Sequence, residues 1–356
     1  MATEIPQSTP PTVAATAAEE EEQVQDQGIE ADDNTDADSA YDGGYFSDTT
    51  SLTSSITRGR LENGRKYQAL REDYWGPSDG QQFESMEMIL SHLMFLIHDH
   101  SQPQPLFRSP IKEPQNILDL GTGKGDWAID VADEFPSAIV HGVDLFPPPS
   151  PWVPPNCFLE VEDILQRWSW RQKFDLIHLR LLFGAFTDPE WEHLYEECFA
   201  HIEPGGWIEQ VEADVRVLCD DDTLPADSNM ASWGPEFLSC GERSGRKLDT
   251  IDTFATRIEK AGFVDIHEQD YKFPVGPWAK GKVYKELGRA NLIHWDRGLE
   301  GWAMWLLTKY GGPPPWSKEE VQVYVAKMKL EMKDPRIHSY VRMRRVWARK
   351  PGQSKH

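Results

Sequence analysis

Residues 116–126 read NILDLGTGKGD, and this stretch decides the fold. Its apolar run is interrupted only by Asp119, and three glycines then follow on alternate positions, Gly121, Gly123 and Gly125. Glycine is required where φ must be positive or where a ligand lies directly on the backbone. A helix that begins near Trp127 adds unpaired N–H groups and a partial positive charge. This order of strand, glycine turn and helix N-terminus is typical of nucleotide-binding α/β folds.

A second strand-like run places an acidic residue where such folds hold a ribose. Ile139–Val143 is mainly apolar and ends in Asp144, nineteen positions after Gly125. An acid about twenty residues beyond the glycines, at the tip of the second strand, can accept hydrogen bonds from a ribose diol. We therefore predict that Asp144 and the adjacent Leu145 bind the cofactor.

Two further acidic residues indicate which ligand the site takes. Asp119 stands just ahead of the glycine turn, where its carboxylate can face an ammonium group instead of a pyrophosphate. Asp163 follows the strand-like segment CFLEVE, where it and Ile164 can meet an adenine and its exocyclic amine. The glycine spacing is G-x-G-x-G, one residue shorter than the dinucleotide fingerprint. A ribose, an adenine and an amino acid together describe S-adenosylmethionine better than a dinucleotide.

Several short motifs resemble those of a known family. DLGTGKG, VDL at 143–145, VED at 161–163, FDLIHLR at 174–180 and EPGGWIEQVE at 203–212 look like class I S-adenosylmethionine-dependent methyltransferases. SLTSSI, ENGRKY, CDD at 219–221, GPW at 276–278 and the closing IHSY and ARKP narrow the resemblance to the LaeA-like methyltransferases of fungi. The resemblance runs from about Leu52 to Pro351. It implies an enzyme of fungal secondary metabolism, acting on pathway intermediates or as a nuclear regulator.

Negative charge is concentrated at the N-terminus. Residues 1–57 contain thirteen Asp and Glu and neither Lys nor Arg, within a chain of net charge −23. Because this composition offers little that can form a core, we expect a disordered acidic tail at 1–57 and a methyltransferase domain at 58–356. An acidic chain lacks the electrostatic footprint of a nucleic-acid-binding protein. The basic residues of Arg342–Arg349 are interpreted as the solvated edges of a last strand.

The sequence also predicts the compartment. It shows neither a secretory signal nor an apolar run of the roughly 20 residues that span a bilayer. Cys157, Cys198, Cys219 and Cys240 lack any CxxC pairing, so neither a metal site nor a disulfide framework is predicted. We expect a cytoplasmic protein without membrane contact, or a nuclear one if the regulator hypothesis holds.

Beyond the glycine turn, strands and helices alternate in the manner of a parallel sheet. The resemblance implies a Rossmann-like α/β sheet of seven strands, which we expect near 116–120, 139–143, 157–161, 174–179, 207–211, 263–268 and 340–348. Helices are expected near 126–135, 189–202 and 252–261. An insertion of about seventy residues before the last strand should add helices near 281–310 and 317–333.

Two apolar features flank this sheet. Apolar residues recur at three- and four-residue intervals from Phe83 to Ile97, which predicts an amphipathic helix. The resemblance implies that it is an N-terminal lid over the cofactor, and the alternative is that it caps the sheet. The insertion carries Trp278, Trp295, Trp302, Trp305 and Trp316. These are either core residues or an aromatic wall for a hydrophobic substrate or a sulfonium cation.

Methyl transfer from a sulfonium requires alignment and exclusion of water, and a base only if the nucleophile must lose a proton. His178 and Arg180 lie on the fourth strand and at its carboxyl end, and we predict them as catalytic residues. His178 faces the other side of the sheet if the strand alternates that way. Glu209 and Glu212 are further candidates for orienting a substrate, and His201 is interpreted as a cation at a helix C-terminus.

Three functional hypotheses follow. The first is a methyltransferase that O- or N-methylates a small-molecule intermediate of fungal secondary metabolism. The second is a LaeA-like nuclear regulator with a protein partner in a transcription-regulating complex. The third is a fold retained for a rearrangement in which the bound sulfonium acts only as a cation. In each case the cofactor is S-adenosyl-L-methionine, and no direct nucleic-acid partner is expected.

Overall fold

The computed structural model describes residues 56–87, 106–150 and 152–352, and its centre is a seven-stranded sheet. In chain order the strands are β3 (Asn116–Leu120), β4 (Ile139–Asp144), β5 (Cys157–Val161), β6 (Phe174–Arg180), β7 (Ile202–Ala213), β8 (Val264–Pro274) and β9 (Tyr340–Arg349). Across the sheet they are ordered β5-β4-β3-β6-β7-β9-β8. The first five are parallel, and β9 runs antiparallel to β7 and β8. The predicted seven-stranded α/β sheet is confirmed.

The sheet has a topological switch point at β3. The chain proceeds from β3 outward through β4 to β5, and then returns to the other side of β3 with β6. In open α/β sheets the crevice at such a point, beyond the carboxyl ends of the strands, is where ligands bind. The glycine turn that follows β3 therefore opens onto the expected ligand crevice.

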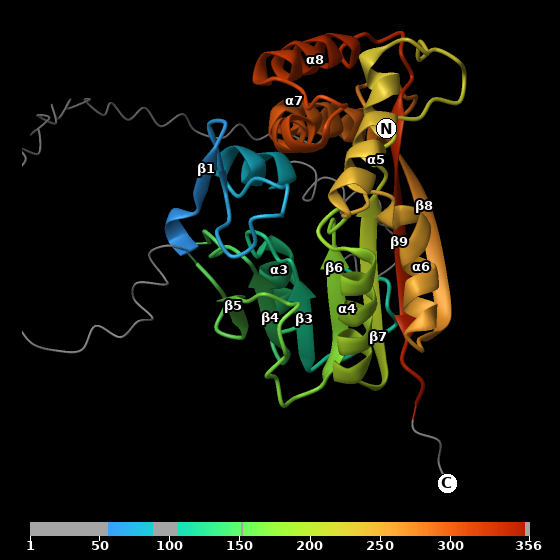
Figure 1. Cartoon of the computed structure of the whole chain (residues 1–356). Coiled ribbons are helices and arrows are strands. Elements are labelled where there is room, and N and C mark those ends of the chain that lie inside the picture. Colours follow the sequence, from blue (N-terminus) through green and yellow to red (C-terminus); the bar gives the residue numbers. More distant parts are fainter. Residues whose placement is uncertain (1–55, 88–105, 151, 353–356) are drawn as a thin grey trace, which may run out of the picture. The chain divides into compact units, whose positions relative to one another are not determined.

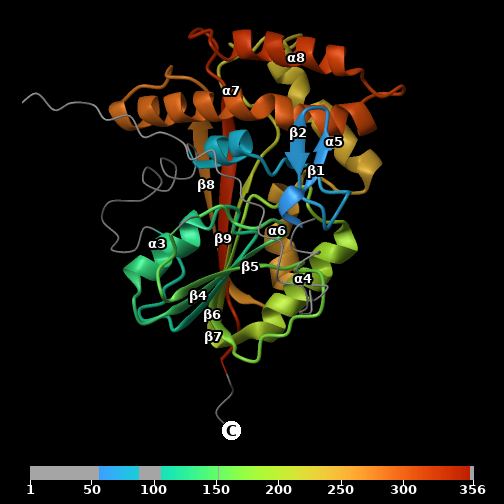
Figure 2. The ribbon, with the colours of Figure 1, turned by 90° about the vertical axis from the view of Figure 1, so that its left-hand side faces the viewer.

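Helices cover both faces of the sheet, which explains why its central strands are almost continuously apolar. The sheet lies between α3 (Asp126–Glu134) on one side and α4 (Asp188–His201) and α6 (Thr250–Lys260) on the other, as Figure 2 shows. The N-terminus of α4 is fixed by a capping box between Thr187 and Glu190. The boundaries of these three helices agree with the predicted ranges to within two residues.

A helical layer stands beyond the carboxyl ends of the parallel strands (Figures 1 and 2). It consists of α7 (Lys282–Tyr310) and α8 (Lys318–Glu331), which confirm the two helices predicted in the insertion, and of α5 (Asn229–Ser244). The sequence did not predict α5, because Gly234, Pro235 and Gly241 interrupt its apolar pattern. It begins at the cap residue Ser228, whose side chain accepts from the Ala231 N–H, and it ends at Gly245 in the left-handed conformation.

The N-terminal part of the domain contributes a hairpin and a short helix. The hairpin pairs β1 (Arg60–Glu62) with β2 (Arg65–Tyr67), and neither strand was predicted. Arg65 anchors it through two hydrogen bonds of 2.7 Å to Asp79. Residues 80–87 are helical, and the rest of the helix predicted over 83–97 lies outside the described residues. Almost all of the predicted acidic tail, 1–57, lies outside them as well.

Two of the predicted polar candidates hold the fold together. Glu209 on β7 is fully buried, accepts hydrogen bonds from the backbone of Arg108 and Ser109, and lies 3.4 Å from the guanidinium of buried Arg345. Glu212 accepts from the backbone N–H groups of Leu182 and Phe183. Burial raises the pKa of Glu212 to about 7. Both carboxylates fix loops that lead into or out of the central strands.

Candidate active site

The three glycines of the turn all have positive φ, at 73° for Gly121, 61° for Gly123 and 86° for Gly125. Gly125 is the N-cap of α3, and a Cβ on Gly121 would lie 2.6 Å from Leu182. A Cβ on Gly123, in contrast, would have no atom within 4 Å. The turn therefore presents bare backbone to an open space at Gly123, which is the geometry for a ligand that lies on the chain.

Asp144 lies across this turn. Its Oδ2 accepts a hydrogen bond of 2.8 Å from the Gly123 N–H, and its Oδ1 accepts one of 3.2 Å from the Phe146 N–H. Burial raises the pKa of the Asp144 carboxyl to about 6, although the hydrogen bonds from these two backbone N–H groups act to lower it. Each oxygen keeps a second lone pair, so the carboxylate can still accept hydrogen bonds from a diol.

A first cavity, of about 60 Å³, gathers most of the predicted cofactor-binding residues. Gly121, Asp144, Leu145, Asp163 and Ile164 all line it. The Asp163 carboxylate accepts from the Leu165 N–H at 3.1 Å and lies 3.8 Å from the Arg71 guanidinium. The carboxyl ends of β3 and β4 and the loop after β5 thus meet at one place, as the spacing of the acids predicts.

A second cavity, of about 130 Å³, continues from the first and shares Gly121 and Asp144 with it. It is lined by Gly123 and Arg180, and the helix 80–87 covers it with Phe83 and Met86. Within the described ranges, the Arg180 guanidinium forms neither a hydrogen bond nor an ion pair. Burial lowers its pKa to about 10, so the guanidinium remains a cation at neutral pH. We name these two spaces together the cofactor cavity.

Asp119 and His178 form a buried pair behind the turn. The Asp119 carboxylate accepts from the Thr122 hydroxyl and from His178 Nδ1, each at 2.7 Å. The His178 ring stacks on Trp127 at a centroid distance of 3.8 Å and is 1% exposed. Burial lowers the pKa of His178, so the imidazole is neutral and donates from Nδ1. Neither side chain lines the cofactor cavity, so their predicted cofactor-binding and catalytic roles stay predictions.

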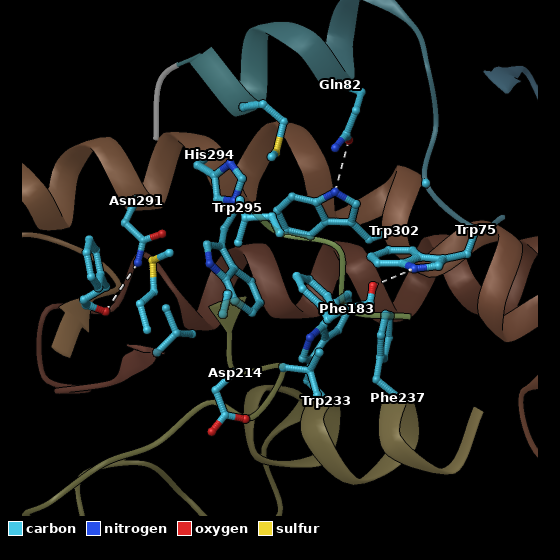
Figure 3. A pocket seen from close by; sticks show the side chains of 18 of the residues that line it. Trp75, Gln82, Phe183, Asp214, Trp233, Phe237, Asn291, His294, Trp295 and Trp302 are labelled. Carbon is cyan, nitrogen blue, oxygen red and sulfur yellow. Dashed lines mark hydrogen bonds between the residues drawn. The ribbon is translucent and has the colours of Figure 1, made fainter. Parts of the chain in front are cut away.

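A third cavity, of about 130 Å³, adjoins the cofactor cavity at Tyr74, Gln82, Met86 and Leu181. Figure 3 shows Trp233 and Phe237 on one side of it and Trp295 and Trp302 on the other. We name it the aromatic cavity. Of the five tryptophans in the insertion, Trp295 and Trp302 line this cavity. Trp295 also belongs to the core with Trp305, Trp302 and Trp316 pack against that core, and Trp278 stacks on His338.

Sequence reasoning missed the polar residues of the aromatic cavity, Gln82, Asp214, Asn291 and His294, and also Tyr74, which lines all three spaces. Asn291, His294 and Trp295 stand at i, i+3 and i+4 on α7. This spacing places them on one helix face, and it was the signal available in the sequence.

Comparison with known proteins extends these observations. A methyltransferase domain model matches residues 98–268. Methyltransferase pytC of Aspergillus terreus is 33% identical over 86% of this chain and 92% of that protein. Secondary metabolism regulator LAE1 of Cochliobolus heterostrophus is 32% identical over 82% of this chain and 95% of that protein. Protein-methionine methyltransferase laeA of Emericella nidulans is 32% identical over 82% of this chain and 76% of that protein.

The chain belongs to the LaeA-like family of S-adenosylmethionine-dependent methyltransferases. The resemblance stated from the sequence is thereby confirmed, and so is the cofactor. Among solved structures, phosphoethanolamine N-methyltransferase 2 of Haemonchus contortus in complex with S-adenosyl-L-methionine is 16% identical, with a TM-score of 0.41, over 79% of this chain and 54% of that chain. No helix in the described ranges of this LaeA-like methyltransferase is long and apolar enough to cross a membrane.

The residues of the cofactor cavity fit S-adenosylmethionine. The open space over Gly123, where a Cβ would meet no atom, leaves room for a ligand on the backbone. The carboxylate of Asp144 and the cation of Arg180 line the same space, and such groups can pair with a ribose diol and with a ligand carboxylate. The charged side chains that line the cofactor cavity are therefore complementary to the ribose and the carboxylate of S-adenosylmethionine.

Proposed function

We propose that this LaeA-like methyltransferase methylates a small molecule of fungal secondary metabolism on oxygen or nitrogen. The observation that carries the proposal is the aromatic cavity, which adjoins the cofactor cavity and shares Tyr74, Gln82 and Met86 with it. A site for methyl transfer needs such a second space, because the acceptor must reach the methyl group while water is excluded. The similarity to Methyltransferase pytC supports the same assignment.

The chain's own residues hold and orient the cofactor in this proposal. Asp144 accepts hydrogen bonds from the ribose diol, and Asp163 meets the adenine amine between Leu145 and Ile164. Arg180 pairs with the carboxylate of the methionyl group. Asp119 stabilises the ammonium group by its charge alone, since it is buried behind the turn and does not line the cofactor cavity. When bound, S-adenosylmethionine supplies a methyl group on a sulfonium, which is already electrophilic.

Alignment is the main contribution of the remaining residues. The helix 80–87 lies against both cavities, and its Glu87 forms an ion pair of 2.8 Å with Lys124 beside the glycine turn. We propose that the helix excludes water from the junction between the two cavities, which is the role of the lid that the sequence predicts.

The experiment combines binding with product analysis. Calorimetry should show that the purified chain binds S-adenosylhomocysteine. Incubation with methyl-labelled S-adenosylmethionine and an extract of fungal metabolites should then place the label in the small-molecule fraction. The variant Arg180→Gln is expected to weaken cofactor binding at least tenfold, because a buried carboxylate loses its cation. The matched variant Arg336→Gln, at an exposed arginine remote from the three cavities, is the control.

A second candidate is a nuclear regulator that acts within a protein complex. It is favoured by the relatives named secondary metabolism regulator and protein-methionine methyltransferase. The same incubation separates the two, since label in the protein fraction and none in small molecules supports the regulator. A fluorescently tagged chain adds an independent observation. We propose a cytoplasmic enzyme, whereas accumulation in the nucleus supports the second candidate.

A further inference from the structure

Among residues 56–87, 106–150 and 152–352, two hydrogen-bond acceptors of the aromatic cavity have no protein partner. The first is on Asn291, which is 1% exposed. Its Nδ2 donates to the carbonyl of Pro274 at 2.9 Å, so the amide orientation is fixed by β8. Its Oδ1 is buried, with no hydrogen-bond partner in the part of the chain that the structure describes. A buried amide oxygen without a partner is costly to the fold, by about 1–3 kcal/mol, unless something else supplies a donor.

The second acceptor is Nε2 of His294, one helical turn further along α7. His294 Nδ1 lies 2.9 Å from the Ser85 carbonyl and 3.0 Å from the Ser85 hydroxyl. That hydroxyl donates its hydrogen to the His294 carbonyl, so both groups at Nδ1 are acceptors. The hydrogen therefore sits on Nδ1, and Nε2 carries a lone pair. Burial lowers the pKa of His294 to about 4, which keeps this tautomer neutral.

The walls of the cavity consist largely of aromatic ring faces. The Trp302 ring lies 4.8 Å from that of His294 and 5.8 Å from that of Trp295. The Trp302 N–H is already donated to Gln82, and the Trp75 N–H to the carbonyl of Phe183 (Figure 3). Flat aromatic walls favour a flat, largely apolar ligand.

Charge and size restrict the ligand further. Among the described side chains that line the cavity, Asp214 is the one that carries a charge. It is already paired with Arg216 at 2.6 Å and with Arg342 at 3.2 Å, so its charge is neutralised. A charged ligand would lose its hydration without gaining a counter-ion. The volume of about 130 Å³ is close to that of a cavity that holds a benzene molecule, about 150 Å³.

We propose that the aromatic cavity is the acceptor-substrate site and takes one uncharged aromatic ring that carries a hydroxyl group. The hydroxyl donates to His294 Nε2, and Asn291 Oδ1 accepts from a second hydroxyl or N–H where the substrate has one. This inference rests on the proposed function and names its substrate class: a phenolic small molecule. The roles of Asn291 and His294 are recognition and positioning of that ring.

The test measures binding of simple probes to the full chain saturated with S-adenosylhomocysteine. Phenol and fluorobenzene have nearly the same size, but only phenol donates a hydrogen bond. Ligand-observed NMR titration should give a dissociation constant for phenol at least tenfold lower than for fluorobenzene, although fluorobenzene is the more apolar of the two. Phenyltrimethylammonium, the cationic probe, should bind at least tenfold more weakly than phenol.

Variants assign the preference to the proposed acceptor. His294→Leu should reduce the preference for phenol over fluorobenzene to less than threefold, and His294→Gln, which retains an acceptor, should restore part of it. The control is His193→Leu, at an exposed position of α4. Affinity for S-adenosylhomocysteine should be unchanged in all three variants, which also shows that they are folded.

The outcomes separate this inference from the proposed function. Equal binding of phenol and fluorobenzene, tighter binding of the cation, or an unchanged preference in His294→Leu would overturn the inference while the cofactor still binds. Failure of the wild-type chain to bind S-adenosylhomocysteine would instead remove the proposed function. Methylation of phenolic compounds by the wild type, with a raised KM in His294→Leu, would support both.

Discussion

The cofactor cavity and the aromatic cavity adjoin each other but are built differently. The predicted cofactor-binding residues lie in one continuous segment, from Asp119 to Ile164, which forms a single run of strand, turn, helix and two further strands. The aromatic cavity draws on at least six separate parts of the chain, from Tyr74 to Met343. The predicted part of the cofactor cavity depends on backbone conformation within neighbouring elements, whereas its remaining lining comes from residues 68–87 and 180–186. The aromatic cavity depends on side chains that only tertiary packing brings together. The sequence therefore predicted cofactor-binding residues but not the residues of the aromatic cavity.

The largest effect is expected from a variant that blocks the cofactor cavity and leaves the aromatic cavity intact. Gly123→Val should abolish detectable binding of S-adenosylhomocysteine, a loss of at least a hundredfold, because the new side chain fills the space over the backbone. Phenol binding to the aromatic cavity should survive. Calorimetry with both ligands measures the two effects separately.

The control for this variant is Gly245→Val. Gly245 also has positive φ, at 74°, and its added Cβ would also meet nothing within 4 Å, but it lies at the end of α5, outside the three cavities. The backbone strain of a β-branched residue at positive φ is therefore common to both variants. If Gly245→Val lost cofactor affinity to the same extent, strain and not lost space would be the cause.

This contrast also explains which parts of the fold and of the site could be predicted from the sequence. The glycine turn, the tip of β4 and the positions of the strands along the chain follow from local patterns, namely alternate glycines, an acid at a fixed spacing and repeated apolar runs. For His294 the helical spacing with Asn291 and Trp295 was the available signal, and it did not indicate a role, because that role depends on Ser85, which lies 209 positions earlier in the chain. The helix α5 was missed because Pro235 contradicts local propensity, and the packing of Trp233 and Phe237 in the core outweighs it.

A smaller effect should come from Asp144 at the same turn. Asp144→Ala removes the predicted acceptor for the ribose diol and also the partner of the Gly123 N–H. Charge-assisted hydrogen bonds contribute about 1.5–3 kcal/mol each, so we expect the affinity for S-adenosylhomocysteine to fall tenfold to a hundredfold. Phenol binding should not change. Unchanged cofactor affinity together with a lower melting temperature would show that Asp144 stabilises the glycine turn and does not bind the ribose.

The pKa of Asp144 adds a pH dependence with a defined sign. Because burial raises this pKa to about 6, the folded carboxyl takes up a proton more readily than the unfolded one. Its contribution to stability is therefore complete below about pH 4 and is lost as the pH rises through 6. Cofactor binding has the opposite trend, since the ribose needs the ionised form. Affinity should rise severalfold from pH 5 to pH 7, and Asp144→Asn should flatten that rise in the same titration.

The next prediction separates positioning from catalysis at His178. His178→Phe keeps the stack on Trp127 but removes the donor to Asp119, which leaves a buried carboxylate short of one partner. We expect a loss of about 1–3 kcal/mol in the free energy of unfolding, hence a melting temperature several degrees lower. With saturating cofactor, kcat should stay within about threefold of the wild type. A hundredfold loss of kcat without loss of stability would establish His178 as the catalytic base.

The smallest effect is expected from the N-terminal segment. Deletion of residues 1–55 should change the melting temperature by about 1 °C at most and the affinity for S-adenosylhomocysteine by less than about twofold, because their composition offers little to a core. In the described part of the chain, the residues that line the three cavities begin at Gln68. The deletion also removes thirteen negative charges from a chain of net charge −23, and charge can act on a ligand over about 8 Å at physiological ionic strength. Repeating the calorimetry at low and high salt separates the two causes. A difference that disappears in high salt is electrostatic and leaves the boundary of the site intact, whereas a loss that persists places part of the segment within the cofactor cavity.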